Sequence, residues 1–224
     1  MTSTGRPPLR RERIMESAVA LADRAGLEAV SMRAVAAELG VVPMALYKHV
    51  ADKDDLVGGM IDTVVAAYPT PNPSGPWAAR VRAAVLGARA AMLRHPWMRP
   101  AIESRHAPTP IVLGHMEAIG AAMRDGGLST DLVHHAMHAM GSRIWGISPE
   151  SFAGAGAAAP DEATAAAVAS RFPTVAAIAA ETAATGGECA AEAEFAFVLD
   201  LLLDAIERLH ATGWRSGRGA ATAR

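Results

Sequence analysis

The chain has 224 residues, of which 51% are hydrophobic and 20% charged, a balance that fits one ordinary domain or two small ones and is too apolar for a disordered chain. The formal net charge of −2 excludes binding of polyanions through overall charge, so any affinity for nucleic acid has to come from a local patch. The single cysteine, Cys189, excludes an intrachain disulfide framework, and together with the lack of a signal-peptide pattern or a long apolar run it predicts a cytoplasmic protein.

The N-terminal part of the chain predicts a flexible arm followed by short helices. Residues 1–9 are polar and contain two prolines, which is typical of an arm. Apolar residues then recur at helical spacing from Ile14 to Ala25 and predict a first helix. Ser31 is placed to cap a second, short helix that ends at Gly40.

A third helix is expected over residues 42–50, because Pro43 fits a first turn and Leu46 and Val50 form an apolar i,i+4 pair. Asp52 is placed to cap a fourth helix. Two short helices joined by a glycine-containing turn have the size of a helix-turn-helix, whose second helix enters the major groove of DNA. Residues 10–67 therefore predict a DNA-binding domain, and the alternative is a helical hairpin with a structural role alone.

Residues 68–76 hold most of the proline-rich run YPTPNPSGPW, which no helix crosses, and they predict a linker between two domains. A second, all-helical domain is expected over 77–212 and a disordered tail over 213–224. Its helices are predicted near 76–94, 109–125, 129–146, 161–170, 173–184 and 189–211. Residues 152–169 are rich in alanine and glycine, and their pattern leaves a loop and a weak helix equally open. No strand-like alternation is present, so the predicted fold class is all-α.

Basic and aromatic residues gather on the outward side of the third helix. Tyr47, Lys48 and His49 lie beside its apolar pair, and Lys53 follows at the start of the fourth helix. The first 50 residues carry seven basic and five acidic side chains, so the remainder is net acidic. This asymmetry favours a nucleic-acid-binding module at the N-terminus.

The run GLEAVSMRAVAAELGVVPMALYKHVADKDDLV strongly resembles the N-terminal domain of the tetracycline-repressor (TetR) family, and the rest of the chain is similar in length and helix order to the C-terminal domain of the tetracycline-repressor type. The resemblance implies a dimeric repressor of a palindromic operator that a small molecule releases. It implies base contacts from Arg33, Pro43, Met44 and Ala45, and phosphate contacts from Tyr47, His49 and Lys53. The full set of DNA-contacting residues that motif and resemblance predict is Ser31, Arg33, Pro43, Met44, Ala45, Tyr47, Lys48, His49 and Lys53.

The last predicted helix is apolar over most of its circumference, which indicates burial on two sides. A homodimer in which this helix packs against its partner explains the pattern, and the alternative is the core helix of a monomer. The predicted interface residues are Phe195, Val198, Leu199, Leu202, Ile206 and Leu209.

Methionines are dense in the C-terminal half, and flexible thioethers suit an adaptable apolar pocket. The predicted effector pocket consists of Trp97, Arg105, His106, Met116, His134, Met137, His138 and Trp145. His134 and His138 are spaced to reach one metal ion, but no third ligand follows at a diagnostic spacing. Interior or pocket histidines are therefore expected, with no metal and no cofactor.

Taken together, the sequence predicts a DNA-binding transcriptional regulator, most simply a repressor that a small-molecule effector releases. One alternative is a DNA-binding activator or architectural protein without an effector. Another is a small-molecule carrier or enzyme, but the chain has no phosphate loop, dinucleotide fingerprint or nucleophile elbow, so no catalytic residue is predicted.

Overall fold

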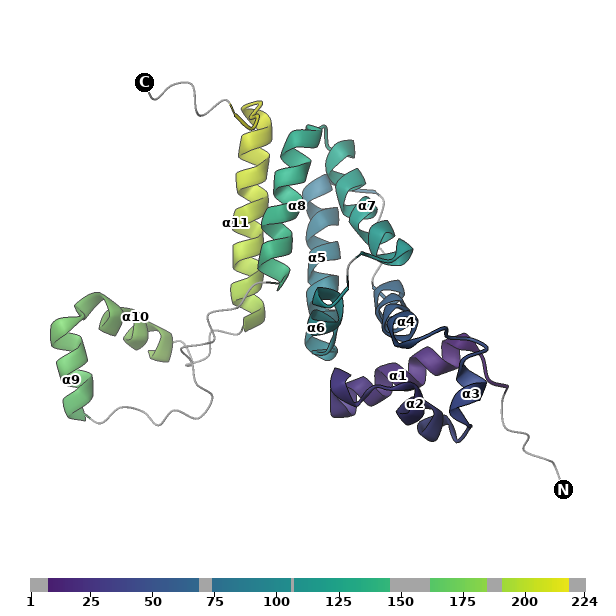
Figure 1. Cartoon of the computed structure of the whole chain (residues 1–224). Helices are drawn as coiled ribbons and strands as arrows, with labels where there is room; N and C mark the ends of the chain where they lie inside the picture. The colour runs from purple at the N-terminus through teal and green to yellow at the C-terminus, as the bar shows by residue number, and fades with distance from the viewer. Residues whose placement is uncertain (1–7, 69–73, 106, 146–161, 185–190, 218–224) are drawn as a thin grey trace. The chain divides into compact units, whose positions relative to one another are not determined.

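The computed structural model describes residues 8–68, 74–105, 107–145, 162–184 and 191–217, and all regular structure in these residues is helical (Figure 1). The elements are α1 (Arg11–Ala25), the short 3₁₀ helix η1 (Leu27–Ala29), α2 (Met32–Leu39), α3 (Pro43–Leu46), α4 (Lys53–Ala66), α5 (Trp77–Arg94), α6 (Met98–Glu103), α7 (Pro110–Asp125), α8 (Thr130–Trp145), α9 (Glu162–Arg171), α10 (Pro173–Ala184) and α11 (Ala191–Ala211). The predicted all-α class is confirmed. None of the described helices is long and apolar enough to cross a membrane.

The chain forms two compact units. The first comprises residues 1–137 and 215–224, and the second residues 138–214. In the first unit α1 packs against α2 and α4, α2 packs against α3, and α4 also contacts α5, α6 and α7. In the second unit α9 packs against α10. The predicted linker at 68–76 falls within the span of the first unit, and the domain boundaries predicted from the sequence remain a prediction.

The N-terminal helices begin and end where local chemistry favours it. The Ser31 hydroxyl accepts a hydrogen bond from the Ala34 amide at 3.1 Å, and the Asp52 carboxylate accepts one from the Asp55 amide at 2.8 Å. Both side chains therefore cap their helices as predicted. Gly40 ends α2 in the left-handed region, at φ 62° and ψ 38°, which glycine adopts without steric cost. This turn brings α3 back against α2.

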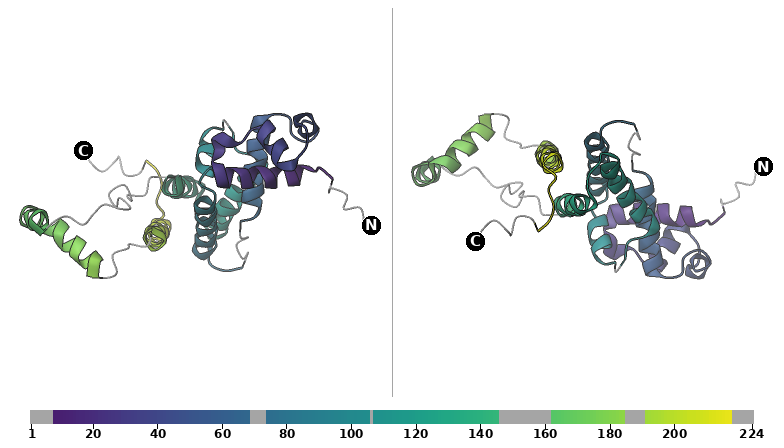
Figure 2. Two further views of the ribbon diagram at one scale, coloured as in Figure 1. Left: turned by 90° about the horizontal axis from the view of Figure 1, so that it is seen from below. Right: turned by 90° about the horizontal axis from the view of Figure 1, so that it is seen from above.

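One apolar core runs through the first unit from α1 to α6. It includes Ile14, Leu46, Leu56, Met60 and Met98, each fully buried. The left view of Figure 2 shows α1 to α4 gathered into one body around this core. Because Met98 belongs to the same core as Leu46, the helix-turn-helix segment and the first helices after the linker share their packing.

Three local features differ from the sequence expectation. Regular helix in α3 ends at Leu46 and not at Val50, because the His49 amide bonds the Leu46 carbonyl and closes a tight turn there. Helix α6 was not predicted, and Pro100 lies in its first turn, where a missing N–H costs nothing. The described part of the tail, predicted to be disordered, is fixed to the start of α8, because both the amide and the hydroxyl of Ser216 donate hydrogen bonds to the Asp131 carboxylate at 2.7 Å.

Candidate nucleic-acid interface

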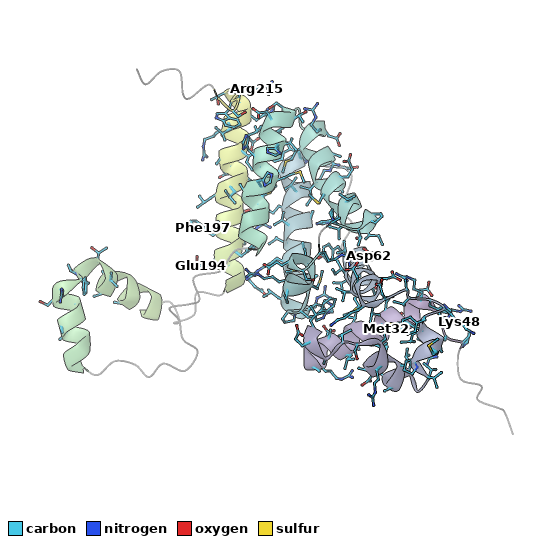
Figure 3. The ribbon with its side chains drawn as sticks, in the orientation of Figure 1. Met32, Lys48, Asp62, Glu194, Phe197 and Arg215 are labelled. Atoms are coloured by element: carbon cyan, nitrogen blue, oxygen red, sulfur yellow. The ribbon has the colours of Figure 1, made fainter. Side chains whose placement is uncertain are left out.

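Helix α3 presents one buried and one exposed side. Leu46 and Val50 are 0% and 1% exposed and anchor the segment in the core, whereas Met44 and Tyr47 are 71% and 48% exposed. The predicted orientation of the helix is thereby confirmed. Figure 3 shows Lys48 projecting outward from the turn that follows α3. A short helix held by two apolar anchors, with its opposite side free, has the form needed to enter a major groove.

The other predicted DNA-contacting residues lie on neighbouring parts of the same unit. Arg33 is exposed in the first turn of α2, and Lys53 is exposed at the start of α4. Pro43 and Ser31 are exposed as well, while Ala45 and His49 are half-buried. Their contacts with DNA remain a prediction.

A hydrogen-bond network that the sequence did not reveal closes the end of α3. The Arg11 guanidinium donates to the His49 carbonyl at 2.7 Å and to both carboxylate oxygens of Asp55, at 2.6 and 3.0 Å. Asp55 also accepts from the Ala51 amide at 2.8 Å. The hydrogen bond from Arg11 holds the pKa of Asp55 below its ordinary value, so this carboxylate stays ionised and paired.

Helix α4 is tied to later helices by polar contacts along its length. Arg105 donates to the Asp54 carbonyl and carboxylate, at 2.9 and 3.0 Å. Thr109 donates to the Asp62 carboxylate. Beyond the end of α4, the rings of Tyr68 and His115 meet edge to face at 5.0 Å. Burial raises the pKa of Tyr68 to about 12 and lowers the pKa of His115, which leaves both side chains neutral at pH 7.

Trp97 makes its polar contact with the N-terminal helices, and its place in an effector pocket remains a prediction. Its side chain is buried, and its indole N–H donates to the Asp23 carboxylate of α1 at 2.6 Å. His95 contacts the same oxygen at 2.8 Å. Arg105 is likewise turned toward α4 and not toward the helices that follow it. Both residues were assigned to the pocket from their type and position, and neither carried a signal that its partner lies in the N-terminal helices.

The other described residues of the predicted pocket lie on α7 and α8, and their role in binding an effector remains a prediction. Met116, His134 and His138 are exposed, and Met137 lies half-buried with its sulfur near Gly120 of α7. His106 and the side chain of Trp145 lie outside the described residues. In the parts that the structure describes, no group of three histidine, cysteine or acidic side chains is placed to hold a metal ion.

The residues predicted for the dimer interface differ in how far they are exposed on α11, and their contact with a partner remains a prediction. Phe195, Leu199 and Ile206 are 3%, 2% and 5% exposed within the single chain, so they have little surface left for a partner. Val198, Leu202 and Leu209 are half-buried. The opposite side of the helix carries Phe197 and Leu201, which are 62% and 50% exposed. Figure 3 shows Glu194 and Phe197 on the same side of α11. The helix thus has apolar side chains on two sides, as the sequence indicated, and the more exposed side carries Phe197 and Leu201.

Two family models match the chain. Residues 14–60 match the bacterial regulatory proteins of the tetR family, and residues 68–210 match the tetracyclin repressor-like C-terminal domain. The second match alone covers more than half of the chain, so the resemblance noted from the sequence is confirmed.

Curated relatives and solved structures agree with this family. The HTH-type transcriptional repressor DrrR1 of Streptomyces coeruleorubidus is 38% identical over 128 residues, 55% of this chain and 47% of that protein. An HTH-type transcriptional regulator of Saccharopolyspora erythraea is 32% identical over 151 residues, 66% of this chain and 64% of that protein. The chain thus spans about half to two thirds of the length of the curated relatives that it matches.

Among solved structures, the transcriptional regulator SCO7222, a TetR from Streptomyces coelicolor, superposes with a TM-score of 0.71 at 29% identity over 91% of this chain and 100% of its own. Apo ActR from the same organism gives a TM-score of 0.71 at 24% identity over 93% and 100%, which shows a shared fold. The exposed α3 on its buried anchors and the two family matches lead to one conclusion: this chain belongs to the TetR family of bacterial regulatory proteins.

Proposed function

We propose that the chain is a DNA-binding transcriptional regulator, a repressor that binds a palindromic operator as a homodimer and is released by a small-molecule effector. The observation that carries the proposal is α3, with Leu46 and Val50 buried and Met44 and Tyr47 exposed, inside the segment that matches the tetR family. The family is one of regulators, and we assign the chain no enzymatic activity.

Base readout rests on few side chains. Pro43 and Met44 cannot make bidentate hydrogen bonds to a base, so their contribution is apolar contact with thymine methyl groups. Arg33 and Lys48, both exposed, supply the donors for base edges. Tyr47, His49 and Lys53 hold phosphates and fix the register of the protein on DNA. Lys53 begins α4, where the helix dipole also favours an anion.

The dimer is proposed through the free side of α11. Phe197 and Leu201 are spaced i,i+4 and exposed by 62% and 50%, and half-buried Val198 lies beside them. Exposed apolar side chains that adjoin one another on one face of a helix are typical of an interaction surface. Two-fold pairing of this face would bury Phe197 on both protomers, since an isologous interface uses the same patch twice.

The effector is proposed to bind in the C-terminal part of the chain. ActR, which shares this fold at 24% and 23% identity, has been solved in complex with actinorhodin and with (S)-DNPA. A ligand that prefers one arrangement of the C-terminal helices shifts the population of DNA-binding states by its differential affinity. The ion pair of Arg105 with Asp54 connects the end of α6 to α4, and the hydrogen bond from Thr109 to Asp62 connects the start of α7 to α4.

The proposal is tested by a gel shift with the DNA upstream of the chain's own gene, titrated with salt. Specific, competitor-resistant binding is expected. Arg33→Ala should cost about 1–3 kcal/mol and relax one base position, whereas Tyr47→Ala should weaken binding to all DNA sequences. Arg24→Ala is the matched control, because this arginine of α1 is paired with Glu38 at 3.0 Å and has no proposed DNA contact.

If neither the upstream DNA nor a random-sequence selection yields a specific site, the DNA-binding proposal fails. The alternative of a small-molecule carrier is then favoured. If binding is specific but a metabolite screen on the bound complex releases none of it, the activator or architectural reading is favoured. The dimer is tested separately by sedimentation of Phe197→Glu, which should be monomeric, with Glu194→Gln on the same side as a control that stays dimeric. A dimeric Phe197→Glu variant would place the interface elsewhere.

A further inference from the structure

The inference concerns the end of α3 and rests on the proposed function. Regular helix covers only Pro43–Leu46, and so short a helix has no stability of its own. Leu46 and Val50 anchor the segment in the core, and the Leu46 carbonyl accepts hydrogen bonds from the His49 and Val50 amides, but these contacts are all local to the segment. The backbone that carries Tyr47, Lys48 and His49 needs a further restraint if these side chains are to meet DNA in a fixed geometry.

Arg11 supplies a restraint of the right kind. Nη1 donates to the His49 carbonyl at 2.7 Å and to Oδ2 of Asp55 at 3.0 Å, and Nη2 donates to Oδ1 at 2.6 Å. Oδ2 of Asp55 in turn accepts from the Ala51 amide at 2.8 Å. Three segments far apart in sequence, the start of α1, the turn after α3 and the first turn of α4, are therefore joined through one guanidinium. The His49 carbonyl, which no helix continues, gains a charged donor.

Arg11 also neutralises a negative charge beside the proposed phosphate contact. Asp52, Asp54 and Asp55 lie in or beside the first turn of α4, next to the proposed phosphate contact of Lys53. An unpaired carboxylate at Asp55 would repel DNA phosphates. Arg11 cancels that charge, while its own donors toward His49 and Asp55 are already engaged within the protein and are not directed at DNA.

We propose that Arg11 is a positioning residue for operator recognition: held by Asp55, it fixes the turn that carries Tyr47, Lys48 and His49 through the His49 carbonyl. Arginine is required because one planar fork reaches the carboxylate and the carbonyl together. A lysine keeps the charge but cannot donate bidentately. Arg11 thus acts on base selection without touching a base.

The experiment uses the full chain and three readouts: affinity for the operator, affinity and salt slope on non-specific DNA, and thermal unfolding. Arg11→Lys should lose about tenfold or more in operator affinity, while non-specific affinity stays within about twofold and its salt slope is unchanged. Arg24→Lys is the matched control, because it makes the same change in the same helix at the exposed pair with Glu38, and it should behave as the wild type.

A double-mutant cycle identifies the partner. Because Arg11 acts through Asp55, Arg11→Lys combined with Asp55→Asn should lose little more operator affinity than the worse single variant. Additive losses, or a loss of non-specific affinity as large as the loss of operator affinity, would instead make Arg11 a direct phosphate contact and overturn the proposal. Operator affinity equal to the wild type in Arg11→Lys would overturn it as well.

Failure of the proposed function is separately visible. In that case the wild-type chain itself shows no sequence-specific binding, and the proposal for Arg11 falls with it. Thermal unfolding keeps the test interpretable, because Arg11→Lys must remain folded at the assay temperature. If it does not, Asp55→Asn, which retains the bond from Arg11 to the His49 carbonyl, is measured alone and should show a smaller loss of operator affinity with the same non-specific slope.

Discussion

Replacing Trp97 with phenylalanine tests whether this residue joins α1 to the loop before α6 or lines an effector pocket. The indole is 3% exposed and donates to Asp23 at 2.6 Å. Loss of a hydrogen bond to a charged group costs about 1.5–3 kcal/mol. The smaller ring adds a further cost of about 1 kcal/mol for the space that it leaves. Asp23 retains His95 and is 31% exposed, so water replaces part of the lost bond, and a total of about 2–3 kcal/mol is expected.

The assay is urea unfolding followed by far-ultraviolet circular dichroism, in which the midpoint should fall at an unchanged slope. Trp77→Phe is the matched control, because this half-buried indole packs against Gly126 and makes no hydrogen bond among the described residues. It should lose clearly less. Equal losses for the two variants, or a Trp97→Phe protein of wild-type stability with weakened effector binding, would refute the role in joining α1 and restore Trp97 to the pocket.

Three further predictions follow from the same structure. Leu46→Ala should lower the free energy of unfolding by about 2–5 kcal/mol, measured by urea unfolding, because the side chain is fully buried beneath α3. Ser31→Ala should cost about 1 kcal/mol in the same assay through loss of the α2 cap, and Ser31→Asp should retain most of it. Burial lowers the pKa of His115, so as the pH falls below about 6.5 the unfolded chain binds a proton that the folded chain resists. Stability should therefore fall with pH in that window, and His115→Gln should flatten the profile in unfolding experiments at pH 5.5 to 7.5; an unchanged slope would contradict the assignment.

The sequence predicted well what depends on local spacing. The apolar periodicity from Ile14, the caps at Ser31 and Asp52 and the inward side of α3 are all properties of residues within four positions of each other, and each agrees with the structure. Helix α6 was not predicted, and its surroundings carry no clear local signal for a helix, since two prolines within five residues, Pro96 and Pro100, are typical of a break. A proline in the first turn carries no such penalty, and a pattern alone does not say which turn it occupies.

Contacts between side chains distant in the chain could not be predicted in the same way. Arg11 and His49 are 38 positions apart, and Asp23 and Trp97 are 74 apart. Each of these residues has an ordinary local explanation: Arg11 as part of a basic arm, His49 as a phosphate contact, Asp23 as a solvated acid and Trp97 as a wall of a pocket. The packing of α1 and α6 against α4, which depends on the whole core, brings the partners within hydrogen-bond distance.

Helix α4 couples the helices on the two sides of the predicted linker, because both sides pack against the middle of this helix. Two consecutive glycines in a helix interior cost about 1 kcal/mol each relative to alanine, and α4 carries Gly58 and Gly59 in its middle. A Cβ at Gly58 would stand 3.0 Å from a guanidinium nitrogen of Arg105, and one at Gly59 would stand 2.5 Å from the Met15 sulfur. The glycines therefore let α1 and the end of α6 approach the same stretch of backbone from two sides.

The first turn of α4 then holds three consecutive residues with different partners. Lys53 is exposed toward the proposed phosphate, Asp54 pairs with Arg105 of the α6 end, and Asp55 pairs with Arg11. Successive helical residues point about 100° apart, so one turn can serve all three directions. A displacement of α6 that pulls Asp54 must move Lys53 and Asp55 with it, because they share a rigid turn. Asp55, whose pair with Arg11 orients the turn after α3, and Asp54, whose pair with Arg105 connects α4 to the end of α6, are thus neighbours in the sequence. Both residues precede the predicted linker at 68–76.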